Sequence, residues 1–287
     1  MGIGNQYKLD DEFKAAARLH QSKYRDEVLQ VGFSDYGNRL TDEHAQALLN
    51  YYDKLNCRRA LRSRYPVYSK TRDADMLRSE HIPFNFFDPF ETHRQMAISI
   101  ISRAFGIDCV AIDLVAIEYA PEPKENYLND ATSFDTYLQV RLPNEKICRI
   151  GIEVKYTEQD YRIGKTEAAN VKDHDSLYWQ TARNSDCFID PDNEIFGSDP
   201  LRQIWRNHLL GLSMLQHGDI DKFYSITLFP DGNTHFHEVL PRYSSLLKED
   251  ARCFVFGCTF ERFISSIRGT SEFNEWKAWL NRRYLIK

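Results

Sequence analysis

The stretch SFDTYLQVRLPNEKICRIGIEVKY, residues 133–156, contains two alternating segments on either side of a short polar turn. In both segments the even-numbered residues are mainly apolar, as at Leu138 and Ile152, and the odd-numbered residues are mainly polar. Because successive side chains point to opposite faces of a strand, this pattern predicts two strands, 133–142 and 148–156, each with one apolar face and one polar face. The residues PNE, 143–145, supply the turn.

The polar face of this hairpin carries opposed charges. A turn centred on Asn144 places Asp135 directly across from Glu153, with Cβ atoms about 5 Å apart. Lys155 projects from the same face, about 7 Å further along the strand. Two directly opposed carboxylates destabilise a sheet unless a cation lies between them, and hard oxygen ligands suit Mg²⁺ or Mn²⁺. The hairpin therefore predicts a metal site.

We expect Asp135 and Glu153 to hold the ion together with the carbonyl oxygen of Val154. Such an ion polarises a phosphoryl oxygen and lowers the pKa of a bound water. Lys155 would orient that water or neutralise developing negative charge. The alternative interpretation is an ordinary surface hairpin in which Lys155 simply forms an ion pair with Glu153.

Elements on both sides of the hairpin indicate a mixed α/β sheet flanked by helices. Apolar spacing predicts helices over 8–30 and 41–63, with Thr41 as the N-cap of the second, and over 88–106 with Asp88 as N-cap. Strands are predicted over 109–119 and 222–230, and a further strand at FVFGCTF, 254–260. Helices are predicted over 198–218 and 272–283, and the polar stretch 157–198 has no clear pattern.

These residues resemble the PD-(D/E)XK nuclease superfamily, the fold of restriction endonucleases. The resemblance rests on Asp135 followed by Glu153-Val154-Lys155 across a hairpin, and on the element order αβββαβ over residues 88–230. More narrowly, GIEVKYTE and the later RQIWRNHLL resemble a bacterial family of largely uncharacterised members. The resemblance implies metal-dependent phosphodiester hydrolysis, with Asp135 and Glu153 as metal ligands and Lys155 as the catalytic lysine. Phe134 stands where the superfamily motif has proline.

Other polar residues are candidates for the same site. The resemblance suggests Glu91 as a further catalytic acid, although a capping partner for Asp88 would also explain it. Gln203 and Arg206, near the start of the helix 198–218, are candidates to touch a phosphate or the metal-bound water; helix-surface polarity is the alternative. His235 and His237 share one face of a predicted strand, but no third metal ligand is apparent.

Composition limits the remaining options. The chain has 287 residues, 42% of them hydrophobic, and a net charge of −5. The segment from Lys54 to Glu80 contains eight basic and three acidic residues. This local excess of basic residues is a candidate for salt-dependent contacts with phosphate. The six cysteines show no zinc spacing and are typical of reduced thiols in a cytoplasmic protein. No apolar run is long enough to cross a membrane, and the first residues do not form a signal peptide.

The sequence thus predicts a helical N-terminal extension, residues 1–80, packed on a nuclease-like domain, residues 81–287. The predicted function is a Mg²⁺-dependent endodeoxyribonuclease of restriction or repair in the bacterial cytoplasm, acting on DNA and open to homodimerisation. Two alternatives stay open. One is a catalytically silent subunit that binds nucleic acid or serves assembly with the same fold. The other is a hydrolase of a small phosphoester.

Overall fold

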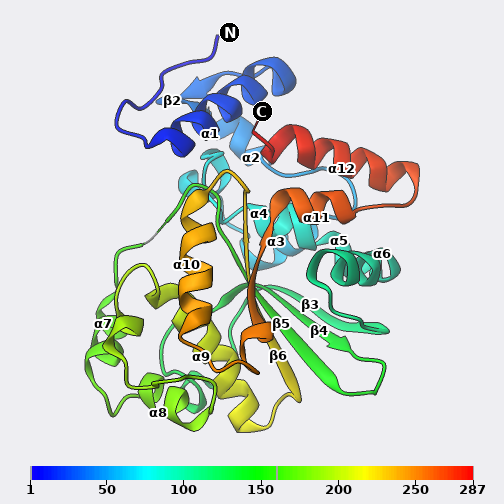
Figure 1. Ribbon diagram of the computed structural model, residues 1–287. Coiled ribbons are helices and arrows are strands. Elements are labelled where there is room, and N and C mark those ends of the chain that lie inside the picture. The colour runs from blue at the N-terminus through cyan, green and yellow to red at the C-terminus, as the bar shows by residue number, and fades with distance from the viewer. Residues whose placement is uncertain (1, 160, 287) are drawn as a thin grey trace.

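A mixed five-stranded sheet forms the centre of the computed structural model, which describes residues 2–159 and 161–286 (Figure 1). Residues 1, 160 and 287 lie outside the described parts, including the outer ends of the two predicted domains. The strands lie in the order β3 (Ala111–Tyr119), β4 (Phe134–Arg141), β5 (Ile147–Val154), β6 (Lys222–Phe229) and β7 (Val255–Thr259). The first three are antiparallel, and β6 and β7 run parallel to β5.

The predicted hairpin register is confirmed. Leu138 pairs with Ile150 and Thr136 with Ile152, and continuing this register places Asp135 across from Glu153. The alternation that predicted it follows from burial, because Leu138, Ile150 and Ile152 are all fully buried.

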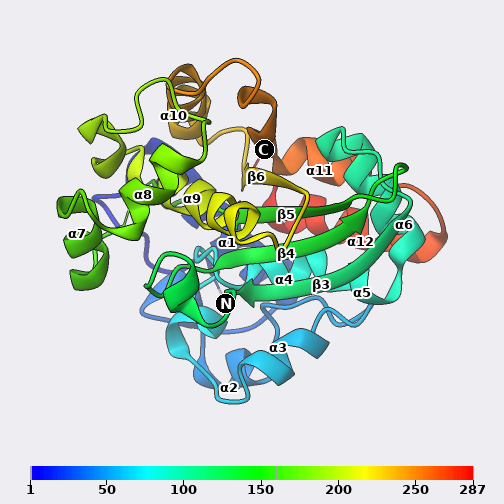
Figure 2. The same ribbon diagram turned by 90° about the horizontal axis from the view of Figure 1, so that it is seen from below.

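Helices cover both faces of the sheet. The face carrying the even-numbered residues of β4 and β5 packs against α4 (Ile82–Phe87), α5 (Pro89–Thr92), α6 (Arg94–Ile100), α11 (Phe260–Ser266) and α12 (Ser271–Tyr284). The other face packs against α8 (Leu177–Asn184), α9 (Arg202–His217) and α10 (Thr234–Ser245). Seen from below, α9 lies across the sheet near β5 and β6, with α7 (Lys165–Lys172) and α8 beyond it (Figure 2).

The close approach of α9 to the sheet depends on a glycine. A Cβ atom at Gly211 would lie 2.0 Å from the ring of Phe223 on β6, far inside any real contact. Gly211 therefore lets the helix backbone lie directly against an aromatic side chain of the sheet. This contact fixes the height of α9 above β5 and β6, and so the reach of its polar side chains.

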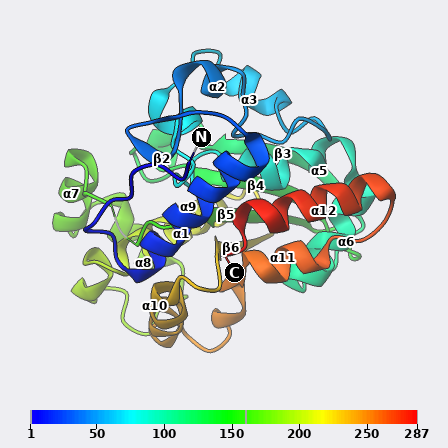
Figure 3. The same ribbon diagram turned by 90° about the horizontal axis from the view of Figure 1, so that it is seen from above.

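The N-terminal extension is built from short elements. It contains α1 (Glu12–Lys23), a π-helical turn Tyr24–Leu29, the small hairpin of β1 (Phe33–Ser34) and β2 (Tyr36–Leu40), and the short helices α2 (Asp42–Gln46) and α3 (Arg59–Arg64). From above, α1 and α12 meet over the sheet (Figure 3). Gln21 of α1 donates to the hydroxyl of Tyr156 at 2.6 Å and to the carbonyl of Arg283 at 2.7 Å. The extension thus packs on the core, whereas the boundary at residue 80 stays a prediction.

The αβββαβ order of the core is confirmed, but several local expectations were wrong. The predicted second helix is interrupted, because α2 ends at Gln46 and α3 begins at Arg59. Thr41 does cap α2 by accepting a hydrogen bond from the His44 N–H. Asp88 does not cap α5, the helix that follows it; its carboxylate accepts instead from the Ala60 N–H, in the first turn of α3, at 3.1 Å.

His235 and His237 lie on the helix α10 and not on a strand. The stretch 157–198, left unassigned from sequence, forms α7 and α8 and is named the insertion below. Among the described residues no helix combines the length and apolarity that a membrane span requires.

Candidate active site

The ends of three neighbouring strands bring three carboxylates into one row. Asp135 stands at the start of β4, with Glu153 opposite it at the end of β5. On the other side, the pairing of Ile117 and Tyr119 with β4 brackets Glu118 opposite Asp135. Asp135 is therefore flanked by a like charge on either side, a costly arrangement unless a cation or protons compensate it.

The pKa of Asp135 is strongly affected by its burial and by its neighbours in this row. Burial, and after it the charges of Glu153 and Glu118, raise the pKa of Asp135 well above its ordinary value. Lys155 and one hydrogen bond oppose this shift: the Val154 N–H donates to Oδ2 of Asp135 at 2.7 Å. Val154 was expected to offer its carbonyl oxygen, and the contact seen here is through its N–H.

Lys155 follows β5 directly, and its side chain is only 10% exposed. Its backbone N–H donates to the carbonyl of Leu228 at 2.8 Å, which extends the pairing with β6. Its Nζ lies 2.7 Å from Oε1 of Glu153. Burial lowers the pKa of Lys155, but the neighbouring charges of Glu153 and Asp135 outweigh it, so that the net shift is upward. The ammonium group is thus held charged at the strand end.

Glu153 is gripped by the helix α9. Gln203 donates from Nε2 to Oε1 of Glu153 at 2.5 Å, and Asn207 donates from Nδ2 to Oε2 at 2.7 Å. Residues 203 and 207 are one helical turn apart and therefore share a face of α9. The two amides and Lys155 satisfy both oxygens of the Glu153 carboxylate, which explains how the strand tolerates a charge only 13% exposed.

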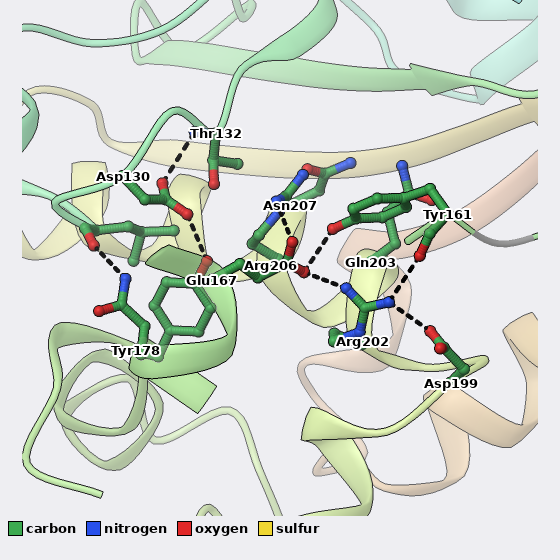
Figure 4. Close-up of polar contacts among 12 residues, drawn as sticks. Asp130, Thr132, Tyr161, Glu167, Tyr178, Asp199, Arg202, Gln203, Arg206 and Asn207 are labelled. Carbon is green, nitrogen blue, oxygen red and sulfur yellow. Dashed lines mark hydrogen bonds and ion pairs between the residues drawn. The ribbon is translucent and has the colours of Figure 1, made fainter. Parts of the chain in front are cut away.

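Arg202 and Arg206, which directly precede Gln203 and Asn207 in the sequence, bind a second glutamate, Glu167 (Figure 4). Arg202 Nη1 lies 2.5 Å from Oε1 of Glu167, and Arg206 Nη1 lies 2.9 Å from its Oε2. The hydroxyl of Tyr161 donates to the same carboxylate at 2.5 Å, and both guanidinium groups lie over the Tyr161 ring. Glu167 and Tyr161 belong to the insertion. One pair of α9 side chains therefore binds a glutamate of the sheet, and the neighbouring pair binds a glutamate of the insertion.

The network continues to the loop before β4. Tyr178 of α8 donates from its hydroxyl to Oδ2 of Asp130 at 2.5 Å, and the Thr132 N–H donates to Oδ1 at 2.9 Å (Figure 4). This loop leads directly into Asp135. The insertion therefore buttresses both the helix that holds Glu153 and the segment that delivers Asp135.

A small pocket opens where these elements meet. Its walls include Glu153, Lys155, Tyr161, Gln203, Asn207 and Thr227. No group of three or more His, Cys, Asp or Glu side chains in the described parts of the chain is arranged to hold a metal ion. A cation here would have two protein carboxylates as ligands, and its other ligands would be a backbone carbonyl, water or substrate oxygens, an arrangement that Mg²⁺ commonly adopts.

The predicted residues divide into three groups. The structure brings Asp135, Glu153, Lys155 and Val154 together, and Gln203 reaches Glu153. Arg206 lies nearby but is occupied by Glu167. The arrangement does not bring Glu91 to this site, because its carboxylate lies 3.1 Å from Arg94.

Arg94 in turn donates to the carbonyl of Ile112, near the other end of β3. Ile112 lies five residues before Ile117, the β3 partner of Thr136, or roughly 17 Å along the strand. The expectation that Glu91 supplies a further catalytic acid therefore finds no support in this arrangement.

Glu118 is the acid that sequence reasoning missed. Burial, and after it the charge of Glu153, raise the pKa of Glu118. Its backbone has φ 57°, a left-handed conformation uncommon for a non-glycine residue and frequent at functional sites. A bulge between Ile112 and Leu114 shifts the register of β3 against β4, so parity counted from the start of the strand is misleading. The signal available was the EY pair, 118–119, that ends the strand.

Comparison with known proteins gives one family match. The family model described as the PD-(D/E)XK nuclease superfamily matches residues 8–286. No curated protein and no solved structure gives a significant match. The family match runs from before α1 to the end of α12, and it therefore includes the N-terminal extension and the insertion as well as the central sheet. The chain belongs to the PD-(D/E)XK nuclease superfamily.

Proposed function

We propose that this protein is a metal-dependent nuclease that hydrolyses phosphodiester bonds in DNA. The observation that carries the proposal is the placement of Asp135 across from Glu153, with the charged Lys155 buried beside them at the end of β5. Membership of a nuclease superfamily supports a nucleic-acid substrate. An endodeoxyribonuclease of restriction or repair remains the specific form we propose, in a bacterial cytoplasm.

The residues present fit a hard divalent cation. Among the described residues, Asp135 accepts a hydrogen bond at Oδ2, from the Val154 N–H, which leaves Oδ1 for a ligand. Asp135 and Glu153 would hold Mg²⁺ or Mn²⁺, with the Val154 carbonyl as a third oxygen. When bound, the ion would supply charge stabilisation at the phosphoryl group and a water of lowered pKa.

The protein's own side chains would do the positioning. Lys155 places a positive charge at the strand end, where it can orient the attacking water or balance negative charge on the phosphoryl oxygens. Gln203 and Asn207 fix the Glu153 carboxylate from the opposite side. A carboxylate held in this way needs little reorganisation during the reaction.

Plasmid cleavage with Mn²⁺ tests the proposal. We expect supercoiled DNA to be nicked by the wild type, and the rate to fall at least about a hundredfold in Lys155→Ala and Asp135→Ala. Glu91→Gln, outside the carboxylate row, is the matched control and should retain activity. Equal nicking by all four proteins would show that the activity does not arise at this site.

One observation favours the silent-subunit alternative. Both oxygens of Glu153 already accept hydrogen bonds, and Lys155 lies against one of them, so the pair is satisfied as it stands. Calorimetric titration with Mn²⁺ separates the two functions. Binding by the wild type that is lost in Asp135→Ala supports the nuclease, and no binding by either supports the silent subunit. Size-exclusion chromatography with light scattering, with and without DNA, tests the proposed homodimer.

A further inference from the structure

Most of the basic side chains between residues 54 and 80 already have partners within the protein. Five of its eight basic side chains form ion pairs: Lys54–Glu275, Arg59–Asp88, Lys70–Asp35, Arg72–Asp73 and Arg78–Glu80. A sixth, Arg58, donates to the carbonyls of Leu48 and Tyr51. Only Arg62 and Arg64 are exposed and have no carboxylate at ion-pair distance among the described residues.

Arg64 lines a groove that lies beside the row of carboxylates. The groove has a volume of about 270 Å³, and its walls include Arg64, Lys124, Thr132 and Ser133. The Ser133 hydroxyl donates to Glu118 at 3.2 Å, which joins the groove to the carboxylate row. Arg64 is close enough to oppose the upward shift in the pKa of Glu118, although burial dominates that shift.

The groove offers two cations without a carboxylate at ion-pair distance among the described residues, and one unpaired hydroxyl. The Arg64 guanidinium lies 5.8 Å from the centre of the Tyr65 ring. Lys124 is exposed on the loop after β3. Thr132 is 3% exposed, and its hydroxyl finds no hydrogen-bond partner in the described parts of the chain. Of the two acids in the walls, Asp130 is engaged by Tyr178 and the Thr132 N–H, and Glu122 is exposed. The walls thus hold two cations and two carboxylates, but the Asp130 oxygens already accept hydrogen bonds, and the two cations and the Thr132 hydroxyl are the donors left for an anion with several acceptor oxygens.

On the opposite wall, the arginines of α9 are already paired. Arg202 and Arg206 share the Glu167 carboxylate, so that a second carboxylate is needed to balance their two charges. Arg202 also pairs with Asp199 at 2.8 Å. A polyanion that approaches the carboxylate row would therefore meet, at Arg64 and Lys124, cations without a carboxylate at ion-pair distance in the described parts of the chain, whereas both arginines of α9 are already paired.

We propose that Arg64 and Lys124 bind the phosphate backbone of a nucleic-acid strand in this groove, beside the scissile position. The inference rests on the proposed function and adds to it the side from which the substrate enters. Phosphate contacts of this kind fix position without reading sequence. Each one makes binding depend on salt, with a slope of about −0.9 per contact on duplex DNA and about −0.7 on a single strand.

Fluorescence anisotropy with labelled duplex and single-stranded oligonucleotides, in EDTA and over a range of salt, tests the proposal without any cleavage. The double variant Arg64→Ala/Lys124→Ala should bind at least about tenfold more weakly. The slope of log affinity against log salt should also become less steep, by the amount expected for the loss of about two phosphate contacts. Arg64→Lys, which keeps the charge, should retain the slope. Lys54→Ala, one charge lost at an exposed ion pair, is the control for net charge and should bind like the wild type.

The outcomes separate the two claims. If the wild type binds neither oligonucleotide, the proposed nuclease function fails, and this inference fails with it. If the wild type binds and the double variant binds equally well with the same salt slope, the nuclease proposal stands but the groove is not the path of the strand. Thermal melting of each variant verifies that it is folded before binding is compared.

Discussion

Replacing Glu167 by glutamine should lower the free energy of unfolding by far more than the loss of one hydrogen bond would. Glu167 is the only carboxylate in the described residues that contacts both Arg202 and Arg206, whose side chains are 2% and 18% exposed. Removing one partner of a buried ion pair costs about 3–5 kcal/mol, because it leaves a buried charge uncompensated. Asp199 stays with Arg202, and Arg206 is partly exposed, so we expect the lower end, about 3 kcal/mol.

Urea denaturation followed by tryptophan fluorescence and circular dichroism measures this loss. Asp192→Asn is the matched control, because Asp192 lies in the same insertion and pairs with Arg183 at 2.7 Å, but both side chains are at least one-third exposed. Such a surface pair contributes about 0–1 kcal/mol. If Glu167→Gln lost no more than Asp192→Asn, the insertion would not be fastened by this network, and the reasoning would be refuted.

Three further predictions concern α9. Asn207→Ala should lower the free energy of unfolding by about 1.5–3 kcal/mol, because a charge-assisted hydrogen bond to a buried carboxylate is lost; urea denaturation measures it. Burial lowers the pKa of His208 to about 3, below its unfolded value of about 6.5, so its stability contribution is present above about pH 6.5 and lost as pH falls towards 3. His208→Gln should flatten the pH dependence of unfolding in that window, and an unchanged slope would contradict the assignment. Gly211→Ala should cost at least about 1–3 kcal/mol through its clash with Phe223, whereas Gly32→Ala, whose new Cβ would lie 3.8 Å from Thr41, should be nearly neutral in the same thermal melts.

The central hairpin was predictable because its information is local. A period of two and a three-residue turn signal together fix which side chains face each other, and one face is apolar enough to exclude a slip by one residue. This is why the opposition of Asp135 and Glu153 followed from the sequence. The same local logic located α9 and β6, whose apolar spacing and flanking proline and glycine are clear.

The surroundings of the hairpin were not predictable in the same way. Glu167 is 35 residues from Arg202 in sequence, and neither residue has a local feature that marks the other as its partner. Glu118 was hidden by a bulge that breaks parity along its strand. Such contacts depend on tertiary packing, and a single sequence carries no periodic trace of them.

The helix α10 was misread for a different reason. The alternation His235-Phe236-His237 imitates a strand, and Pro241 argues against a helix interior. Burial of Phe236, Val239 and Tyr243, at helical spacing, shows the signal that outweighed both. The helical spacing was therefore present in the sequence, but the three-residue segment 235–237 was too short to reveal it.

Gln21 joins the first helix to the last at Tyr156, the residue directly after Lys155. The helices α1 and α12, which are far apart in the sequence, are therefore joined at the residue that follows the lysine on which the proposed chemistry depends. Removal of either helix should disturb the end of β5 as well as the outer layer of the fold. Shortened versions of this protein should accordingly be judged by the state of that lysine before any loss of function is assigned to the segment removed.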